Sequence, residues 1–387
     1  PQFLFTKNAT TGGSGKDWVM VDNMRGVATG GNDEYLFANQ ANAEASADLY
    51  DFNATGFSVK NGGGSVNGSG DTHIYMAIRR GGMQTPTAAS SVFEVINPAG
   101  SSSTTWSSGN SSGSLFTDFF LGKPRTSVSG TSWVASSRLT PKFLNTNNNN
   151  AENATQYTDF DTNSGVNWIN TWVGTNDSTY LSYHWKRAKG FFDVVAYTGD
   201  GTTNRSISHN LGVAPELMFH KRRNSNNDWY VPDFINSKIL ILNATSAAYD
   251  TSILANYYGS GNGSSGGAGS LVTPDASTFT VTPNQNVNAS GDTYTVYLFA
   301  SLTGISKIGS YTGDGSTDGS KVIDCGFSSG ARFVLIKRTD NVGSWYVWDT
   351  ERGIVVGNDP ILQLNSDAAE VTASDDLVPS SSGFAVR

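Results

Sequence analysis

A phrase built around tryptophan recurs along this chain of 387 residues, and this internal repeat constrains the fold more than any other feature. The phrase reads Asp-Trp-Val-Met-Val-Asp-Asn-Met-Arg-Gly at 17–26, Asp-Trp-Tyr-Val-Pro-Asp at 228–233 and Ser-Trp-Tyr-Val-Trp-Asp-Thr-Glu-Arg-Gly at 344–353. A short apolar run that reaches a lysine precedes each copy, at 1–7, 215–222 and 331–338. A weaker copy of that run, at 118–123, precedes Trp133. We therefore expect one kind of unit, built four times.

Further shared phrases follow in the same order within each unit. An apolar phrase that reaches asparagine occurs at 36–39, 143–147, 240–243 and 361–365. Three units then carry an apolar phrase at 56–59, 277–281 and 383–386, and a closing aromatic phrase occurs at 67–75, 176–183 and 288–297. A spacing of roughly a hundred residues is the size of a domain and exceeds the period of a solenoid repeat. We define unit 1 as 1–85, unit 2 as 86–193, unit 3 as 194–305 and unit 4 as 306–387.

The two outer units lack parts of this pattern. Unit 1 begins at the apolar run without the Tyr-Thr-Gly-Asp-Gly phrase that leads into units 3 and 4 at 197–201 and 311–315. Unit 4 stops before the closing phrase. We therefore expect unit 1 to be incomplete at its N-terminus and unit 4 at its C-terminus, as in a fragment or an ordered portion of a longer polypeptide. A missing strand in unit 4 would leave an unpaired sheet edge. Among the four units, unit 2 is the most divergent in sequence.

The composition and the periodicity both indicate β-strands. Glycine is abundant, with 43 residues, and charged residues make up only 15% of the chain, whereas aromatic residues reach 11% and suffice for packed cores. In the run 345–348, strict alternation predicts that Trp345 and Val347 share one face and that Tyr346 and Trp348 share the other. The prediction is an all-β protein of tandem antiparallel β-sandwich domains, of jelly-roll or concanavalin-like type. The best candidate for a helix is a short one over 41–50.

The tryptophan of each unit is expected to be a structural core residue. These four residues are Trp18, Trp133, Trp229 and Trp345. A tryptophan buries a large apolar area, and the alternating residues beside it set the register of the hairpin. Each indole is therefore predicted to lie in the core of its own unit.

The charge distribution excludes several classes of protein. The formal net charge is −8 and the longest basic cluster is the run 221–223, so a phosphate-binding surface is not expected. No apolar stretch has the length of a membrane span. Cys325 is the only cysteine, which rules out an intrachain disulfide, and its apolar surroundings favour a small core residue. We expect no nucleic acid, no membrane insertion and no cofactor.

Residues that carry chemistry are sparse and scattered. The four histidines, His73, His184, His209 and His220, have no metal-ligand spacing, and a structural role is the preferred interpretation of each. Asp200 and Asp314 precede glycines, which favours turns with positive φ, and calcium binding there is the alternative. No nucleophile or phosphate-binding motif occurs, so no catalytic or metal residues are predicted. Paired carboxylates that cleave glycosides stay open as an alternative, because such pairing is spatial.

Several aromatic residues lie in loop-like sequence and are candidates for stacking on sugar rings. These are Trp106, Trp168, Trp172, Tyr257 and Tyr258. The alternative for each is packing beneath long loops or at contacts between domains or subunits.

One stretch of the chain resembles a known family. The run 185–201, Trp-Lys-Arg-Ala-Lys-Gly-Phe-Phe-Asp-Val-Val-Ala-Tyr-Thr-Gly-Asp-Gly, is followed by Ser-His-Asn-Leu-Gly at 208–212. Together with the repeated phrases, it resembles repeat modules of tailed-phage virion appendage or tail fibre proteins of the marine and cyanophage type, with a concanavalin- or LamG-like β-sandwich. The resemblance covers nearly the whole chain and is clear for units 1, 3 and 4.

The resemblance implies a structural or adhesive virion protein that is not an enzyme. Its expected partners are copies of itself, other virion proteins and a host-surface glycan. One alternative is a carbohydrate-binding lectin or a polysaccharide-degrading enzyme on a concanavalin-like fold, which would require a groove with carboxylates beside stacked aromatics. Another alternative is an extracellular bacterial adhesin or filament protein.

Overall fold

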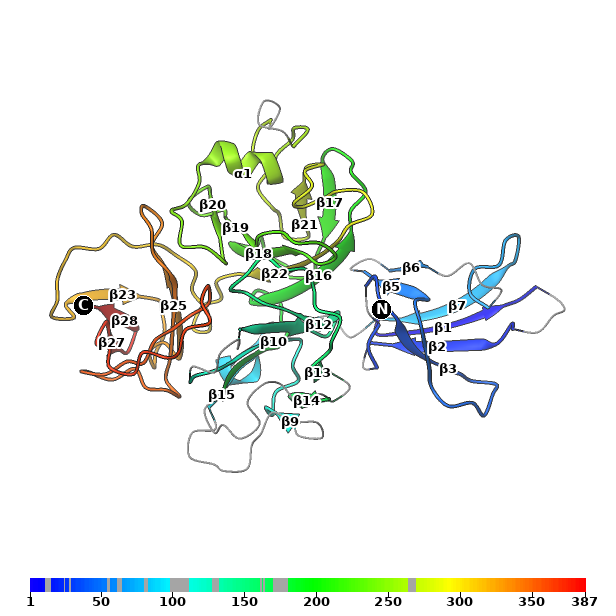
Figure 1. Cartoon of the computed structure of the whole chain (residues 1–387), viewed down its shortest axis with the longest axis horizontal. Helices are drawn as coiled ribbons and strands as arrows, with labels where there is room; N and C mark the ends of the chain where they lie inside the picture. The colour runs from blue at the N-terminus through cyan, green and yellow to red at the C-terminus, as the bar shows by residue number, and fades with distance from the viewer. Residues whose placement is uncertain are drawn as a thin grey trace.

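A computed structural model of the chain describes residues 1–10, 15–23, 25–27, 29–53, 56–60, 65–79, 83–97, 111–126, 132–160, 162, 164–169, 180–263 and 269–387. The protein is all-β, and its strands pair in antiparallel sheets that stack as sandwiches (Figure 1). Within the described ranges, no helix is long and apolar enough to cross a membrane.

Unit 1 has one five-stranded sheet and one two-stranded sheet. The larger sheet runs in the order β4 (Ala45–Ala47), β3 (Asp33–Phe37), β2 (Trp18–Asp22), β1 (Phe3–Asn8) and β7 (His73–Ile78). The smaller sheet pairs β5 (Tyr50–Phe52) with β6 (Phe57–Val59). Leu4, Val19 and Val21 point from the larger sheet into the core between the two sheets, where they meet Tyr50 and Phe52.

Unit 2 also has a main sheet of five strands. Its main sheet runs in the order β12 (Thr140–Leu144), β11 (Val134–Ser137), β10 (Phe119–Pro124), β15 (Tyr180–Trp185) and β8 (Phe93–Ile96), which follows the short 3-10 helix η1 (Ala89–Ser91). The opposing sheet consists of β13 (Thr158–Asp159), β14 (Val166–Trp168) and β9 (Ser111–Ser112). Phe120, Val134 and Trp168 fill the space between these sheets.

Unit 3 repeats this arrangement. Its main sheet runs in the order β16 (Phe192–Thr198), β22 (Thr293–Phe299), β18 (Leu217–Arg222), β19 (Tyr230–Asp233) and β20 (Lys238–Ile241). The opposing layer contains β17 (Arg205–Ser208), β21 (Thr278–Val281) and α1 (Thr251–Tyr258). The predicted division between units 2 and 3 falls inside β16, so unit 3 begins with this strand.

Unit 4 has two three-stranded sheets. One consists of β24 (Phe333–Lys337), β25 (Trp345–Asp349) and β26 (Leu362–Gln363), and the other of β23 (Lys321–Asp324), β28 (Gly383–Val386) and β27 (Leu377–Ser380). The predicted alternation in β25 is confirmed. Trp348 lies in the core of the unit and Tyr346 packs against it, whereas Trp345 and Val347 belong to a different core.

That different core is shared by units 2, 3 and 4. It contains Trp133, Trp229 and Trp345 together with apolar residues from the main sheet of each unit. Figure 1 shows the three units arranged around a common centre, with unit 1 (blue) to one side. The expectation that each tryptophan lies in the core of its own sandwich is therefore wrong for these three, and it is wrong for Trp18 too, which is half-buried and lies outside the core of unit 1. Each main sheet has apolar residues on both faces, and the tryptophan face packs against the neighbouring units.

The prediction of a helix over 41–50 is also wrong. This segment contains β4, which pairs with β3, and ends at the start of β5. A carboxylate oxygen of Asp33 accepts hydrogen bonds of 2.9 Å from the Leu49 N–H and 2.7 Å from the Tyr50 N–H. These bonds hold the chain extended. The α-helix of unit 3, α1, forms where Leu254, Ala255 and Tyr258 pack onto the core.

Candidate functional site at the junction of three units

The indole N–H groups of three tryptophans link units 2, 3 and 4 in a closed ring. Each indole donates to a backbone carbonyl two residues before the asparagine that ends the apolar phrase of a neighbouring unit, which we call the Leu-Asn phrase and which ends at Asn147, Asn243 or Asn365. The three pairs are Trp133 to Gln363 (2.7 Å), Trp229 to Asn145 (2.8 Å) and Trp345 to Ile241 (2.9 Å). Unit 2 therefore donates to unit 4, unit 4 to unit 3 and unit 3 to unit 2. We call this cyclic assembly of units 2, 3 and 4 the ring.

The asparagine of each Leu-Asn phrase holds the tryptophan strand in place. The Trp229 N–H donates to Asn243 Oδ1 at 2.9 Å, and the Trp345 N–H donates to Asn365 Oδ1 at 2.8 Å. In unit 2 the equivalent Asn147 uses its other amide atom, and its Nδ2 donates to Ser132 Oγ, next to Trp133, at 3.1 Å. These bonds fix the backbone from which each indole projects, so that its N–H reaches the next unit.

A lysine from each unit lies beside the tryptophans and also donates to the next unit. Lys221 Nζ donates to the Asn149 carbonyl at 3.1 Å, and Lys337 Nζ donates to the Thr245 carbonyl at 3.3 Å. Lys123 Nζ donates to the Ser366 carbonyl at 3.1 Å. Burial lowers the pKa of Lys123 and of Lys221 to about 8. The apolar runs place these lysines at the ends of β10, β18 and β24, where backbone carbonyls of the neighbour solvate the charge.

Backbone bonds link the same three pairs of units, with donor and acceptor units exchanged relative to the indole bonds. The Glu370 N–H donates to the Arg125 carbonyl at 2.7 Å, the Glu152 N–H to the Arg223 carbonyl at 2.7 Å, and the Ala248 N–H to the Thr339 carbonyl at 2.8 Å. Donor and acceptor positions are equivalent in the three junctions, because each donor follows its phrase asparagine by five residues. The three junctions are therefore copies of one interface.

The contact between unit 4 and unit 2 also contains a buried charge network. Arg352 forms ion pairs of 2.6 Å with Asp349 and 3.1 Å with Glu370, and the Arg352 and Asp349 side chains are 0% exposed. Glu370 in turn pairs with Arg125 of unit 2 at 3.3 Å. The Tyr183 hydroxyl of unit 2 donates to Asp349 at 2.8 Å. Every charge in this network faces an opposite charge, which is the condition under which buried ions are tolerated.

Electrostatics in this network follow from burial and from the paired charges. Burial raises the pKa of the Tyr183 hydroxyl well above its usual range, so the phenol stays a donor. Burial lowers the pKa of Arg352, but Tyr183, Asp349 and Glu370 outweigh that effect, and the net shift is upward. The guanidinium therefore remains charged and holds the two carboxylates together across the junction.

Unit 1 has the tryptophan and the apolar residues of this interface on one face of its main sheet, and no described residue of another unit packs against that face. Trp18 is half-buried and stacks on Phe5 with ring centroids 4.8 Å apart. Its neighbours on β7, Met76 and Ile78, are each 49% exposed, and Ile74 is 51% exposed. We call this surface the tryptophan face of unit 1.

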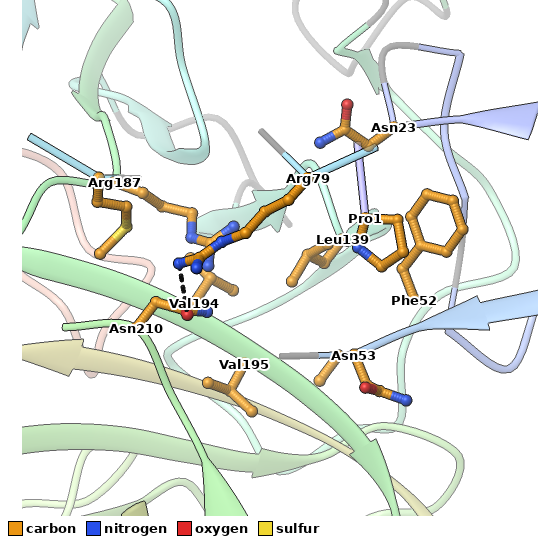
Figure 2. Close-up of a pocket in the computed structure, with 12 residues that line it drawn as sticks. Pro1, Asn23, Phe52, Asn53, Arg79, Leu139, Arg187, Val194, Val195 and Asn210 are labelled. Atoms are coloured by element: carbon orange, nitrogen blue, oxygen red, sulfur yellow. Dashed lines mark hydrogen bonds between the residues drawn. The ribbon is translucent and has the colours of Figure 1, made fainter. Parts of the chain in front are cut away.

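Unit 1 contacts the ring through the end of its sandwich that contains Pro1, away from the tryptophan face. Figure 2 shows Pro1, Asn23 and Phe52 of unit 1 opposite Leu139 of unit 2 and the β16 residues Val194 and Val195 of unit 3. Arg79 bridges this contact by donating to Asn210 Oδ1 at 3.2 Å. The crevice between them measures about 80 Å³, well below the roughly 300 Å³ at which small-molecule sites begin. It is a seam between units with no room for a drug-sized ligand.

Two of the four histidines lie inside sheets as neutral hydrogen-bonding groups. His184 lies between the hydroxyls of Thr117 and Ser182, at 3.0 Å from each. His220 lies between the Tyr197 hydroxyl at 3.0 Å and the Tyr258 hydroxyl at 2.7 Å. Burial lowers the pKa of His184 to about 4 and of His220 to about 3. Across the described ranges, no three histidine, cysteine or acidic residues gather as a metal site.

The two remaining histidines are placed differently. His209 is buried at 5% exposure, and its Nδ1 accepts from the Leu211 N–H at 3.2 Å, whereas His73 is half-buried at the start of β7. Cys325 is a half-buried free thiol that packs against the unit 4 core.

The Asp-Gly phrases have the predicted positive φ at glycine but do not form hairpin turns, and β16 and β17 on either side of Asp200 belong to different sheets. Gly201 and Gly315 have φ of +70° and +76°. One Asp200 oxygen accepts 2.8 Å bonds from both the N–H and the hydroxyl of Thr202, and the other lies 3.2 Å from Arg205. A guanidinium at that distance opposes a calcium ion, so the contacts of Asp200 favour the turn role.

Of the predicted glycan-contacting aromatics, the structure describes Trp168, Tyr257 and Tyr258, and these three do not form one surface. Trp168 is 1% exposed and packs against Phe120 between the sheets of unit 2, so the prediction is wrong for this residue. It is also wrong for Tyr258, which is 0% exposed because it lies on the buried side of α1 and bonds His220. Tyr257 is half-buried against Tyr230, with centroids 4.8 Å apart. Trp106 and Trp172 lie outside the described residues.

The residues that build the ring were not singled out from the sequence, apart from the tryptophans. A signal was nevertheless present: every apolar run reaches a lysine, and units 1 and 4 share Asp-x-x-Arg followed by a later glutamate. Charged residues that recur at fixed positions in otherwise polar-neutral repeats are candidates for buried pairs between the repeats.

Comparisons with known proteins give one family. Neither the curated proteins nor the solved structures contain a significant match to this chain. A family described as a domain of unknown function, DUF7483, matches residues 1–80 and 88–387, and the break between the two ranges lies between β7 and β8. The chain belongs to the DUF7483 family.

Proposed function

We propose that this chain is a structural and adhesive virion protein of a tailed phage, a tail fibre or another surface appendage. The observation that carries the proposal is the ring, in which three sandwiches bury their tryptophan faces in one core. Separate domains in one chain usually meet through modest, mobile interfaces. A shared core with three equivalent junctions instead makes a rigid block, which suits a protein that acts by spacing, assembly and attachment to a host.

The proposed role needs no catalysis. The burial of Trp168 and Tyr258 removes two of the aromatic contacts on which a lectin or polysaccharide-degrading enzyme would rely. We therefore assign no catalytic residue, cofactor or metal. The proposed partners are copies of the chain, other virion proteins and the host surface.

Labelling of particles tests this function. Antibodies raised against residues 1–387 are applied to gradient-purified phage particles and located by immunogold electron microscopy, with pre-immune serum as the control. We expect gold on the tail or on surface appendages, and we expect the same antibodies to slow adsorption to host cells. Absence of the protein from purified particles, together with its secretion by uninfected cells, would overturn the proposal in favour of a bacterial adhesin or filament.

A further inference from the structure

We infer that the tryptophan face of unit 1 is a docking surface for two further β-sandwich units of this family, one with the side chains of unit 2 and one with those of unit 3. Such a pair would complete a second ring in which unit 1 takes the place that unit 4 takes in the first. The inference concerns the partner of one face, and it holds whether or not the protein belongs to a virion.

The apolar part of the tryptophan face has the same layout as the faces buried in the ring. In unit 1, Phe5 pairs with Met20 on one side and with Met76 on the other. In unit 3 the equivalent residue, Phe219, lies opposite Tyr297, and both are in the shared core. A row of half-exposed isoleucine and methionine side chains on one sheet face marks an interaction surface.

The hydrogen-bonding groups of the face are also in place. Lys221 of the ring donates both to Asn227 of its own unit, at 2.5 Å, and to Asn149 of the neighbour, at 3.1 Å. Lys7 makes the own-unit bond, to the Lys16 carbonyl at 2.5 Å. The Trp18 N–H is held by Asn39 Oδ1 at 2.9 Å, as in units 3 and 4. In the ring, carbonyl groups of a neighbouring unit accept the equivalent hydrogen bonds. No described residue provides such a carbonyl for Lys7 Nζ or Trp18 Nε1.

The charged groups identify which kind of unit fits. Arg25 pairs with Asp22 at 2.7 Å and with Glu44 at 3.3 Å, which reproduces the Arg352 network of unit 4. We call Asp22, Arg25 and Glu44 the unit 1 triad. Its Arg25 side chain is 15% exposed and Glu44 is 41% exposed, whereas their unit 4 counterparts are at 0% and 6%.

The unit 1 triad has one net negative charge, which a partner must neutralise before the triad can be buried. In the ring, Arg125 and the Tyr183 hydroxyl of unit 2 meet this need for unit 4. A unit of the unit 2 kind would meet it for unit 1.

Two more copies of unit 1 would not fit as well. Met76 of unit 1 occupies the position that Tyr183 occupies in unit 2. Met76 pairs with Phe5 across the sheet, and Tyr183 pairs with Leu121, the residue of unit 2 that is equivalent to Phe5. Ala9 stands where unit 2 has Arg125. A threefold cluster of unit 1 would therefore bury three triads without a hydroxyl donor or a neutralising guanidinium. Units 2 and 3 of a second chain are also engaged, because their own unit 4 covers them.

The test supplies the missing pair within one polypeptide. A second copy of residues 88–330, which contains unit 2 without its first two residues, unit 3, the lead-in phrase at 311–315 and strand β23, is fused directly before residue 1. The join reproduces the natural sequence context, since Pro1 and Ala331 occupy equivalent positions before Phe3 and Phe333. Hydrogen exchange of the Trp18 indole N–H is then followed by NMR with labelled tryptophan.

The extended chain should slow the exchange of the Trp18 indole at least a hundredfold relative to the original chain. The matched control carries Arg125→Glu in the added copy alone, and it should lose at least ten-fold of that protection. The same substitution in the original copy should leave Trp18 unchanged, because that arginine faces unit 4.

Three results would overturn the inference. In the first, the Trp18 indole exchanges equally fast in both chains although the added tryptophans are protected. In the second, the added units remain unfolded although unit 1 offers the third face. In the third, the original chain forms a trimer by light scattering with Trp18 already protected, which would make copies of this chain the partner of the tryptophan face. None of these results bears on the particle labelling, so the inference and the proposed function fail separately.

Discussion

The indole N–H of Trp345 in unit 4 donates to the carbonyl oxygen of Ile241 in unit 3 across 2.9 Å. Equivalent bonds at the other two junctions close a ring, so each unit is both a donor and an acceptor. A unit can leave this ring only by breaking two junctions and exposing its part of the shared core. The ring is therefore expected to behave as one cooperative body.

Substitutions at Trp345 separate the hydrogen bond from the packing. Trp345→Phe keeps an aromatic ring and removes the donor, and it should lower the free energy of unfolding by about 1 kcal/mol. Trp345→Ala also opens a cavity in the shared core and should cost about 3–5 kcal/mol. Both values come from urea denaturation followed by circular dichroism. Trp18→Phe is the control, because its indole has no acceptor among the described residues, and an equal loss there would contradict the account.

The Arg352 network should be far more sensitive than its copy in unit 1. Arg352→Ala leaves Asp349 and Glu370 buried with one fewer countercharge and should destabilise the ring by about 3–5 kcal/mol. Arg25→Ala removes the matching residue from a partly exposed site and should cost about 1 kcal/mol or less. Comparable losses at the two sites would show that the junction does not bury the network as described.

Acid should weaken units 2 and 3 through their buried histidines. Folding lowers the pKa of His184 to about 4 and of His220 to about 3, from an ordinary value of 6.5. The unfolded chain therefore binds more protons than the folded chain below pH 6.5. Each histidine should reduce the free energy of unfolding by about 1.4 kcal/mol per pH unit as the pH falls from 6.5 to about 4.

The control for this pH dependence is His220→Phe. The variant loses two tyrosine hydrogen bonds and starts less stable, but its stability should fall less steeply between pH 6.5 and 4. Denaturant titrations at several pH values give both slopes. Parallel slopes for the variant and the natural chain would contradict the assignment of a neutral, buried His220.

Calorimetry should distinguish unit 1 from the ring. Unit 1 has its own core and touches the ring through a small seam, whereas units 2, 3 and 4 share one core. We expect one transition for the ring and a separate transition for unit 1. Trp345→Ala should split the ring transition, and a natural chain that already shows three separate ring transitions would argue against a shared core.

The sequence predicted what depends on local pattern. Alternation along β25 correctly placed Trp345 and Val347 on one face and Trp348 on the other, because side chains of a strand alternate by necessity. The positive φ at Gly201 and Gly315 followed from the Asp-Gly phrases in the same way. The all-β fold class followed from the same kinds of pattern.

What the sequence did not predict was which surface each face meets. A strand that is buried on both faces appears in the sequence as one continuous apolar run. The residues of such a run do not indicate whether a face packs in the core of its own unit or in a core shared by three units. Trp168 and Tyr258 have polar neighbours in sequence and are nevertheless buried, because distant strands cover them. The segment 41–50 is extended because Asp33, far away in sequence, binds its backbone.

Hydrogen exchange of the four phrase indoles in the natural chain tests the ring most directly. Labelled tryptophan gives one NMR signal for each indole N–H, and exchange is measured without any substitution. We predict that Trp133, Trp229 and Trp345 exchange slowly and at similar rates, set by opening of the common core, and that Trp18 exchanges much faster. Three widely different rates, or a ring tryptophan that exchanges as fast as Trp18, would contradict a closed ring with one shared core.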